Sequence, residues 1–92
     1  MEQRVCMIIS GHVQMVGFRF YAKDEAKRLG ITGYVRNLPD GNVEIMAEGP
    51  LDAIHKFISS MRKGPPASRV DDVNITRTGP SDETFPSFNI RW

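Results

Sequence analysis

The apolar residues of this chain switch repeatedly between a two-residue spacing and a spacing of three to four residues. The order of these segments constrains the fold more than any other feature. Strands are expected over residues 4–10, 32–38, 42–48, 69–77 and 88–92, and helices from about Phe20 to Leu29 and from Pro50 to Gly64. The order, βαββαβ plus a short terminal strand, predicts an α+β, ferredoxin-like split βαβ fold with two helices packed on one face of an antiparallel sheet.

Details of the pattern place individual segments within this fold. The first strand is apolar on both faces, which predicts a central position in the sheet. Pro39-Asp40-Gly41 predicts a turn that joins the second and third strands into a hairpin. The acidic pair Asp71-Asp72 interrupts the alternation of the fourth strand and predicts a bulge there. A polar loop is expected over residues 79–86, and the buried stripe of the second helix is expected to comprise Leu51, Ile54, Phe57, Ile58 and Met61.

Length and composition limit the classes of protein that remain. A chain of 92 residues predicts a single domain over residues 1–92. Twelve basic and eleven acidic residues leave a net charge of +1, which argues against a nucleic-acid partner. The chain has no apolar run long enough for a membrane span, and its start does not resemble a signal peptide. Cys6 is the only cysteine, which excludes an internal disulfide. A cytoplasmic monomer without membrane association is therefore expected.

The segment from Gly11 to Arg19 carries the chemistry. A loop between a strand and a helix N-terminus offers unpaired backbone N–H groups and the positive end of the helix dipole to an anion. A cation at this end of a helix is unfavourable unless an anion lies beside it, and a guanidinium fits phosphate with two parallel hydrogen bonds. The segment therefore predicts a phosphate-binding loop. The alternative reading is a tight turn followed by a solvated arginine.

Two motifs in this chain resemble the signatures of the acylphosphatase family. The first is Gly11-x-Val13-Gln14-x-Val16-x-Phe18-Arg19, and the second is Gly33-Tyr34-Val35-Arg36-Asn37. Length, element order, the loop over residues 64–69 and the ending over residues 88–92 agree with the same family. The resemblance thus extends over essentially the whole chain.

The resemblance implies an acylphosphatase, an enzyme that hydrolyses acyl phosphates to carboxylate and inorganic phosphate. Arg19 would hold the phosphoryl group together with the loop backbone, and Asn37 would orient the attacking water. The loop comprises Gln14, Met15, Val16, Gly17, Phe18 and Arg19. The resemblance implies no metal, no cofactor and no covalent phosphoenzyme. Inorganic phosphate would be the product and a competitive ligand.

Elementary chemistry agrees with such an enzyme. A departing carboxylate needs no proton, so the reaction requires little acid–base help. A loose phosphoryl transition state requires mainly positioning and charge stabilisation. Arg19 and backbone amides can supply the charge, and a neutral amide such as Asn37 can both accept from and donate to water.

Met15 departs from the family pattern, which usually has glycine at this position. If the loop requires a positive φ here, methionine is strained where glycine would not be. We expect a positive φ at Met15, and the departure bears on the loop geometry and the catalytic rate more than on the fold.

Two other functions fit the same element order. An RNA-recognition domain would need aromatic residues on its central strands, but residues 42–48 contain none and carry Glu44 and Glu48. A non-catalytic anion-binding or regulatory domain of the same fold would keep Arg19 without turnover. Phosphate release from a small acyl phosphate would distinguish all three.

Overall fold

The computed structural model describes residues 2–80 and 85–92, so residues 81–84 of the predicted polar loop lie outside the described residues. The elements follow the predicted order. They are β1 (Glu2–His12), α1 (Phe18–Leu29), β2 (Thr32–Asn37), β3 (Val43–Pro50), α2 (Leu51–Lys63), β4 (Arg69–Pro80) and β5 (Phe88–Arg91).

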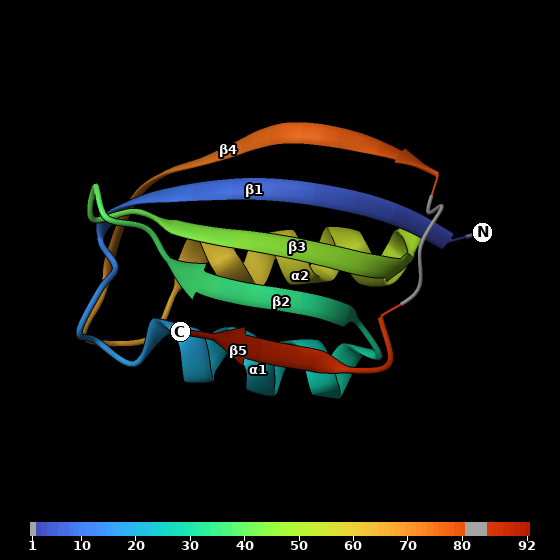
Figure 1. Ribbon diagram of the computed structural model, residues 1–92, viewed down its shortest axis with the longest axis horizontal. Helices are drawn as coiled ribbons and strands as arrows, with labels where there is room; N and C mark the ends of the chain where they lie inside the picture. Colours follow the sequence, from blue (N-terminus) through green and yellow to red (C-terminus); the bar gives the residue numbers. More distant parts are fainter. Residues whose placement is uncertain (1, 81–84) are drawn as a thin grey trace.

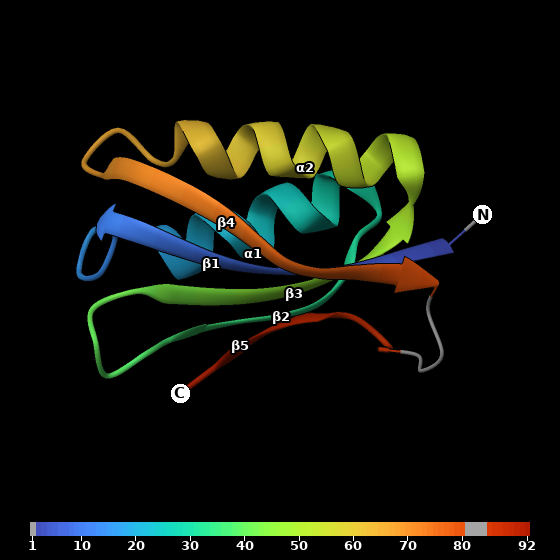
Figure 2. The ribbon, with the colours of Figure 1, turned by 90° about the horizontal axis from the view of Figure 1, so that it is seen from above.

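The five strands form one sheet in the order β4-β1-β3-β2-β5. β1, β2, β3 and β4 pair antiparallel as predicted, whereas β5 runs parallel to β2, so the complete sheet is mixed. Both helices cover the same face, and the other face carries no helix (Figures 1 and 2). The predicted ferredoxin-like architecture is thus confirmed, with β1 in the interior of the sheet.

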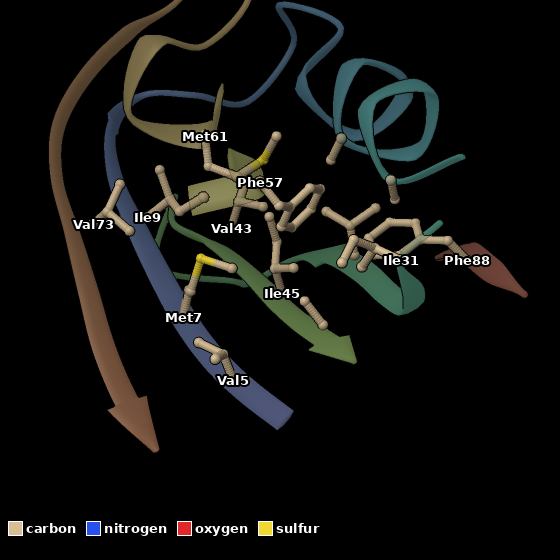
Figure 3. Packing of buried hydrophobic residues seen from close by; sticks show 14 of the residues in the cluster. Val5, Met7, Ile9, Ile31, Val43, Ile45, Phe57, Met61, Val73 and Phe88 are labelled. Atoms are coloured by element: carbon tan, nitrogen blue, oxygen red, sulfur yellow. The ribbon is translucent and has the colours of Figure 1, made fainter. Parts of the chain in front are cut away.

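The core lies between the sheet and the two helices (Figure 3). Val5, Met7 and Ile9 of β1 point into it, while Cys6 and Ile8 are half-buried on the opposite face of the sheet. Phe57 of α2 is fully buried among them, and a phenylalanine side chain contributes about 1.5–3 kcal/mol when buried. The two-residue alternation of β1 therefore separates a packed face from an open one.

The predicted buried stripe of α2 is wrong at one residue, since Leu51 is 51% exposed. The stripe centres on Ala53, Ile54, Phe57 and Met61. Leu51 lies at the edge of this stripe, on the same side of the helix as Ile58, which is only half-buried. The first turn of α2 also lies at the margin of the sheet, where Pro50 pairs with Glu2.

β4 contains the predicted bulge and a second one that the sequence did not indicate. Ser10 pairs with Asp72 and Gly11 with Val70, so Asp71 is the extra residue at the predicted position. Near the other end, Cys6 pairs with Arg77 and Met7 with Ile75. Each bulge shifts the alternation of inward- and outward-facing side chains in β4 by one residue. The continuation of the strand to Pro80 therefore does not appear in the sequence as regular alternation.

Three connections meet at one end of the molecule, where β5 also ends (Figure 1). They are the β1–α1 loop, the β2–β3 turn and the α2–β4 loop. Both sequence motifs lead into this end. In the described part of the chain, neither helix is long and apolar enough to cross a membrane.

Candidate active site

The entrance to α1 leaves donors unpaired. The helix begins at Phe18, two residues before the expected start, after Gly17 with φ 78° and ψ 18°. Gly17 provides no side-chain cap, and the first turn contains no acidic residue. The N–H of Tyr21 donates to the carbonyl of Gly17 at 3.0 Å, which begins the helical ladder. The N–H groups before Tyr21 therefore remain available to a ligand.

The same holds for the preceding loop. Across residues 2–80 and 85–92, no backbone N–H from Gln14 to Arg19 donates to a protein acceptor. A run of free N–H groups at the positive end of a helix attracts an anion. The loop thus has the donors that a bound phosphate would need.

The side chain of Gln14 joins the two motifs. Its Nε2 donates to the carbonyl of Leu38 at 2.8 Å and to the carbonyl of Asn42 at 2.9 Å. Both acceptors belong to the β2–β3 turn, which begins directly after Asn37. The β1–α1 loop is thereby fixed to the segment that carries Asn37. The sequence alone predicts only a backbone role for Gln14 in the site.

Met15 has φ 63°, as expected from its place in the motif, and is the only non-glycine residue in the described chain with a positive φ. Its side chain is 99% exposed and packs against nothing that would offset the strain. A left-handed conformation at such a residue costs roughly 1–3 kcal/mol. The loop therefore stores backbone strain at its outermost residue.

Replacing Met15 by glycine is expected to stabilise the protein. The relieved strain exceeds the added entropy loss of glycine, about 0.5–1 kcal/mol, and no buried contact disappears. A net gain of about 1 kcal/mol would raise Tm by about 4–8 °C in a domain of this size. Thermal melts of Met15→Gly and Met15→Ala check this, because alanine removes the side chain but keeps the strain. A Met15→Gly variant that is both less stable and less active would show that the loop accommodates methionine without strain.

Arg19 lies in the first turn of α1 with its guanidinium over the indole of Trp92, 4.1 Å from the ring centroid. Among the described residues, no carboxylate forms an ion pair with it. A guanidinium stacked through its face keeps the N–H groups at its edges free for hydrogen bonds. Arg19 is therefore a half-buried cation whose donors remain available.

Asn37 is the last residue of β2 and shares the helix-facing side of that strand with Val35. Its side-chain Oδ1 is buried, and no group of the described residues donates a hydrogen bond to it. An unpaired buried acceptor costs about 1–3 kcal/mol, so such atoms are uncommon in folded proteins. An acceptor left without a protein partner at this position is consistent with a ligand or water as its partner.

The neighbouring positive charge points away from this site. Arg36 donates through Nε to Oε1 of Glu44 at 2.7 Å on the open face of the sheet. The hydrogen bond to the Glu44 carboxylate raises the pKa of Arg36. Arg36 is thus held in an ion pair with Glu44, and Arg19 is the cation that the loop itself carries.

A surface hollow of about 410 Å³ lies elsewhere, between α1 and β5, and is lined in part by Lys23, Lys27 and Phe88. It includes neither Arg19 nor Asn37. A phosphate bound by backbone N–H groups at a helix terminus needs a loop rather than a deep cavity. The described residues also contain no group of three or more His, Cys, Asp or Glu side chains that could hold a metal.

The structure brings together most of the residues that the sequence singled out. Gln14 to Arg19 form one continuous loop and helix start, and Gln14 ties this loop to the turn after Asn37. Neither sequence motif indicates Trp92 as a neighbour of Arg19. The available signal was the alternation of the last strand, which places Trp92 on the same side as Phe88, toward the helices.

Comparisons with known proteins agree on one family. The sequence model of the acylphosphatase family matches residues 5–90. An acylphosphatase of Caldivirga maquilingensis is 46% identical over 90 residues, which cover 97% of this chain and 94% of that protein. The crystal structure of acylphosphatase from Bacillus subtilis superposes with a TM-score of 0.93 at 39% identity and covers both chains completely. A full-length HypF, in a phosphate- and nucleotide-bound form, matches with a TM-score of 0.84 at 27% identity over only 12% of its own chain.

These matches span nearly the whole of this chain. The chain belongs to the acylphosphatase family and is an enzyme of that kind.

Proposed function

We propose that this acylphosphatase-family enzyme hydrolyses the carboxyl-phosphate bond of small acyl phosphates, with Arg19 and the loop backbone holding the phosphoryl group and Asn37 orienting the water. The observation that carries the proposal is the run of unpaired N–H groups from Gln14 to Arg19, fixed by Gln14 to the turn that follows Asn37. Family membership and fold support the reaction itself.

Arg19 and the loop would stabilise the charge of the transferring phosphoryl group. Its equatorial oxygens would accept hydrogen bonds from the guanidinium edge and from the free backbone N–H groups. The loop donors need no reorganisation when charge develops, because the fold already holds them. The loose transition state of phosphoryl transfer is stabilised mainly by such donors.

Asn37 would act on the nucleophile. Its buried, unpartnered Oδ1 would accept a hydrogen bond from the attacking water and so direct a lone pair at phosphorus. A strong base is not required, since the departing carboxylate is stable without a proton. The water forms the new P–O bond in line as the bond to the carboxylate oxygen breaks, and solvent takes the proton.

The direct test is phosphate release from acetyl phosphate by the purified 92-residue chain. We expect turnover that exhaustive treatment with EDTA leaves unchanged, because the described chain offers no ligand cluster for a metal and Arg19 supplies the positive charge. A phosphate ester of an aliphatic alcohol, whose leaving group needs a proton, serves as the control and should not be cleaved. Loss of activity on chelation, restored by a divalent ion, would contradict the proposed mechanism.

The HypF match supports one alternative. There the fold occupies a small part of a much longer protein, so the same fold can occur outside a free-standing enzyme. A non-catalytic anion-binding or regulatory domain would bind inorganic phosphate through the loop without releasing phosphate from acetyl phosphate. Phosphate binding without turnover would favour that alternative.

A further inference from the structure

Exposed apolar side chains gather around the proposed site. Among the described residues, four large apolar side chains are exposed: Met15, Phe20, Leu51 and Trp92. Met15 lies in the phosphate loop, Phe20 follows Arg19 in α1, and Trp92 lies over Arg19. Leu51 is the exception, at the opposite end of β1, where Pro50 pairs with Glu2. Single exposed apolar residues are ordinary, but three around one polar site are not explained by packing.

The indole of Trp92 has a fixed place in this group. Arg91 aligns with Arg36 in the parallel pairing of β5 with β2, so Trp92 follows β5 beside the end of β2 at Asn37. The contact with the guanidinium of Arg19, at 4.1 Å, holds the ring on the helix side of the sheet. Despite this contact Trp92 is 86% exposed, so most of the indole surface remains free.

We propose that Trp92 determines acyl-group specificity, because its free indole surface would contact the acyl group of a substrate held by Arg19. The enzyme would then prefer acyl phosphates with an aromatic or otherwise apolar acyl group. The inference rests on the proposed function. A phosphoryl group that accepts hydrogen bonds from the edge of the Arg19 guanidinium lies beside the indole ring that covers the face of that guanidinium. The acyl group of the substrate is attached directly to this phosphoryl group. An exposed aromatic ring next to this position can stabilise a bound substrate by covering the apolar surface of its acyl group or by stacking on it.

The kinetic test compares benzoyl phosphate with acetyl phosphate in wild type, Trp92→Ala, Trp92→Phe and Leu51→Ala. We expect wild type to favour benzoyl phosphate in kcat/KM, and Trp92→Ala to reduce that preference about tenfold, equivalent to about 1.4 kcal/mol. Trp92→Phe should keep most of the preference. Leu51→Ala removes an equally apolar exposed side chain far from the site and should leave the preference unchanged. Thermal melts confirm that each variant is folded.

The inhibition constant of inorganic phosphate separates this role from a purely positioning one. If Trp92 contacts the acyl group, Trp92→Ala leaves phosphate inhibition nearly unchanged, because phosphate has no acyl part. Equal losses on both substrates with weaker phosphate inhibition would overturn the proposal and leave Trp92 as a positioning residue for Arg19. An unchanged preference would also overturn it. Wild type that fails to hydrolyse acetyl phosphate would instead contradict the proposed function.

A second readout needs no turnover. Trp92 is the only tryptophan of the chain, so its fluorescence reports on this one ring. Phenacylphosphonate and acetonylphosphonate replace the bridging oxygen of benzoyl and acetyl phosphate by a methylene group and cannot be hydrolysed at that bond. We expect phenacylphosphonate to bind more tightly and to change the emission more than acetonylphosphonate at equal occupancy. Equal binding and equal spectral change would contradict contact between the indole and the acyl group.

Discussion

Arg19→Lys is expected to lower kcat/KM for acetyl phosphate by at least about 10²-fold and to weaken inhibition by inorganic phosphate. Lysine keeps the charge but loses the planar fork that gives two parallel bonds to phosphate. It also cannot lie flat on the indole of Trp92, where Arg19 is 4.1 Å from the ring centroid. Misplacing a reacting group by about 1 Å can cost on the order of 10²-fold in rate.

Arg28→Lys is the matched control for this result. Arg28 lies in the last turn of the same helix and pairs with Glu25 at 2.8 Å. Its Nε and Nη2 both donate to Glu25, so lysine loses a fork here too, but the loss of an exposed surface pair costs little stability. Steady-state kinetics should therefore show full activity for Arg28→Lys. An Arg19→Lys variant with most of the wild-type kcat/KM would remove Arg19 from the mechanism.

The element order could be predicted because each segment has a clear periodicity and ends at a breaker. α1 ends at Gly30, which has φ 73°, a conformation that favours glycine. The partner of the last strand could not be predicted. Phe88 and Ile90 predict a strand with one apolar side, but nothing local specifies that it runs parallel to β2. Tertiary packing determines this pairing, since Phe88 packs against Phe57 of α2 with ring centroids 5.8 Å apart.

The candidate site was predictable to the extent that it depends on backbone and motif. A positive φ at Met15 follows from a loop shape in which glycine is usual, and the structure has φ 63° there. The side-chain bridge from Gln14 could not be inferred, because it depends on how close the β2–β3 turn comes to the loop. The stack of Arg19 on Trp92 joins residues from opposite ends of the chain and likewise depends on where β5 pairs. Local sequence specifies a donor or a ring, but not its partner.

Asn37→Ala is expected to lower kcat by about 10²-fold while changing phosphate inhibition little. The proposed contact of Asn37 is with water rather than with the phosphoryl group, and an interaction made only in the transition state affects kcat and kcat/KM alike. Initial rates across a range of acetyl phosphate concentrations, with and without inorganic phosphate, separate the two effects. Equal losses in turnover and phosphate affinity would make Asn37 a ligand of the phosphoryl group.

Stability provides an independent check on the same variant. If Asn37 were retained for structure, its removal would break hydrogen bonds and lower the free energy of unfolding. Its Oδ1 instead lacks a protein partner, so alanine removes a buried acceptor whose desolvation costs about 1–3 kcal/mol. We expect the Tm of Asn37→Ala to be equal to or above that of wild type. Asn74→Ala, at an exposed position on β4, should change neither Tm nor kcat.

A variant that loses turnover without losing stability would identify the unpaired oxygen as a feature maintained for the reaction. The fold keeps Oδ1 buried at the end of β2, and no group in the described part of the chain donates a hydrogen bond to it, which a purely structural residue at the end of a strand would not require. A lower Tm for Asn37→Ala, with kcat reduced only in proportion to the unfolded fraction, would show the opposite. In that case Asn37 would stabilise the β2–β3 hairpin, and another group would have to orient the water.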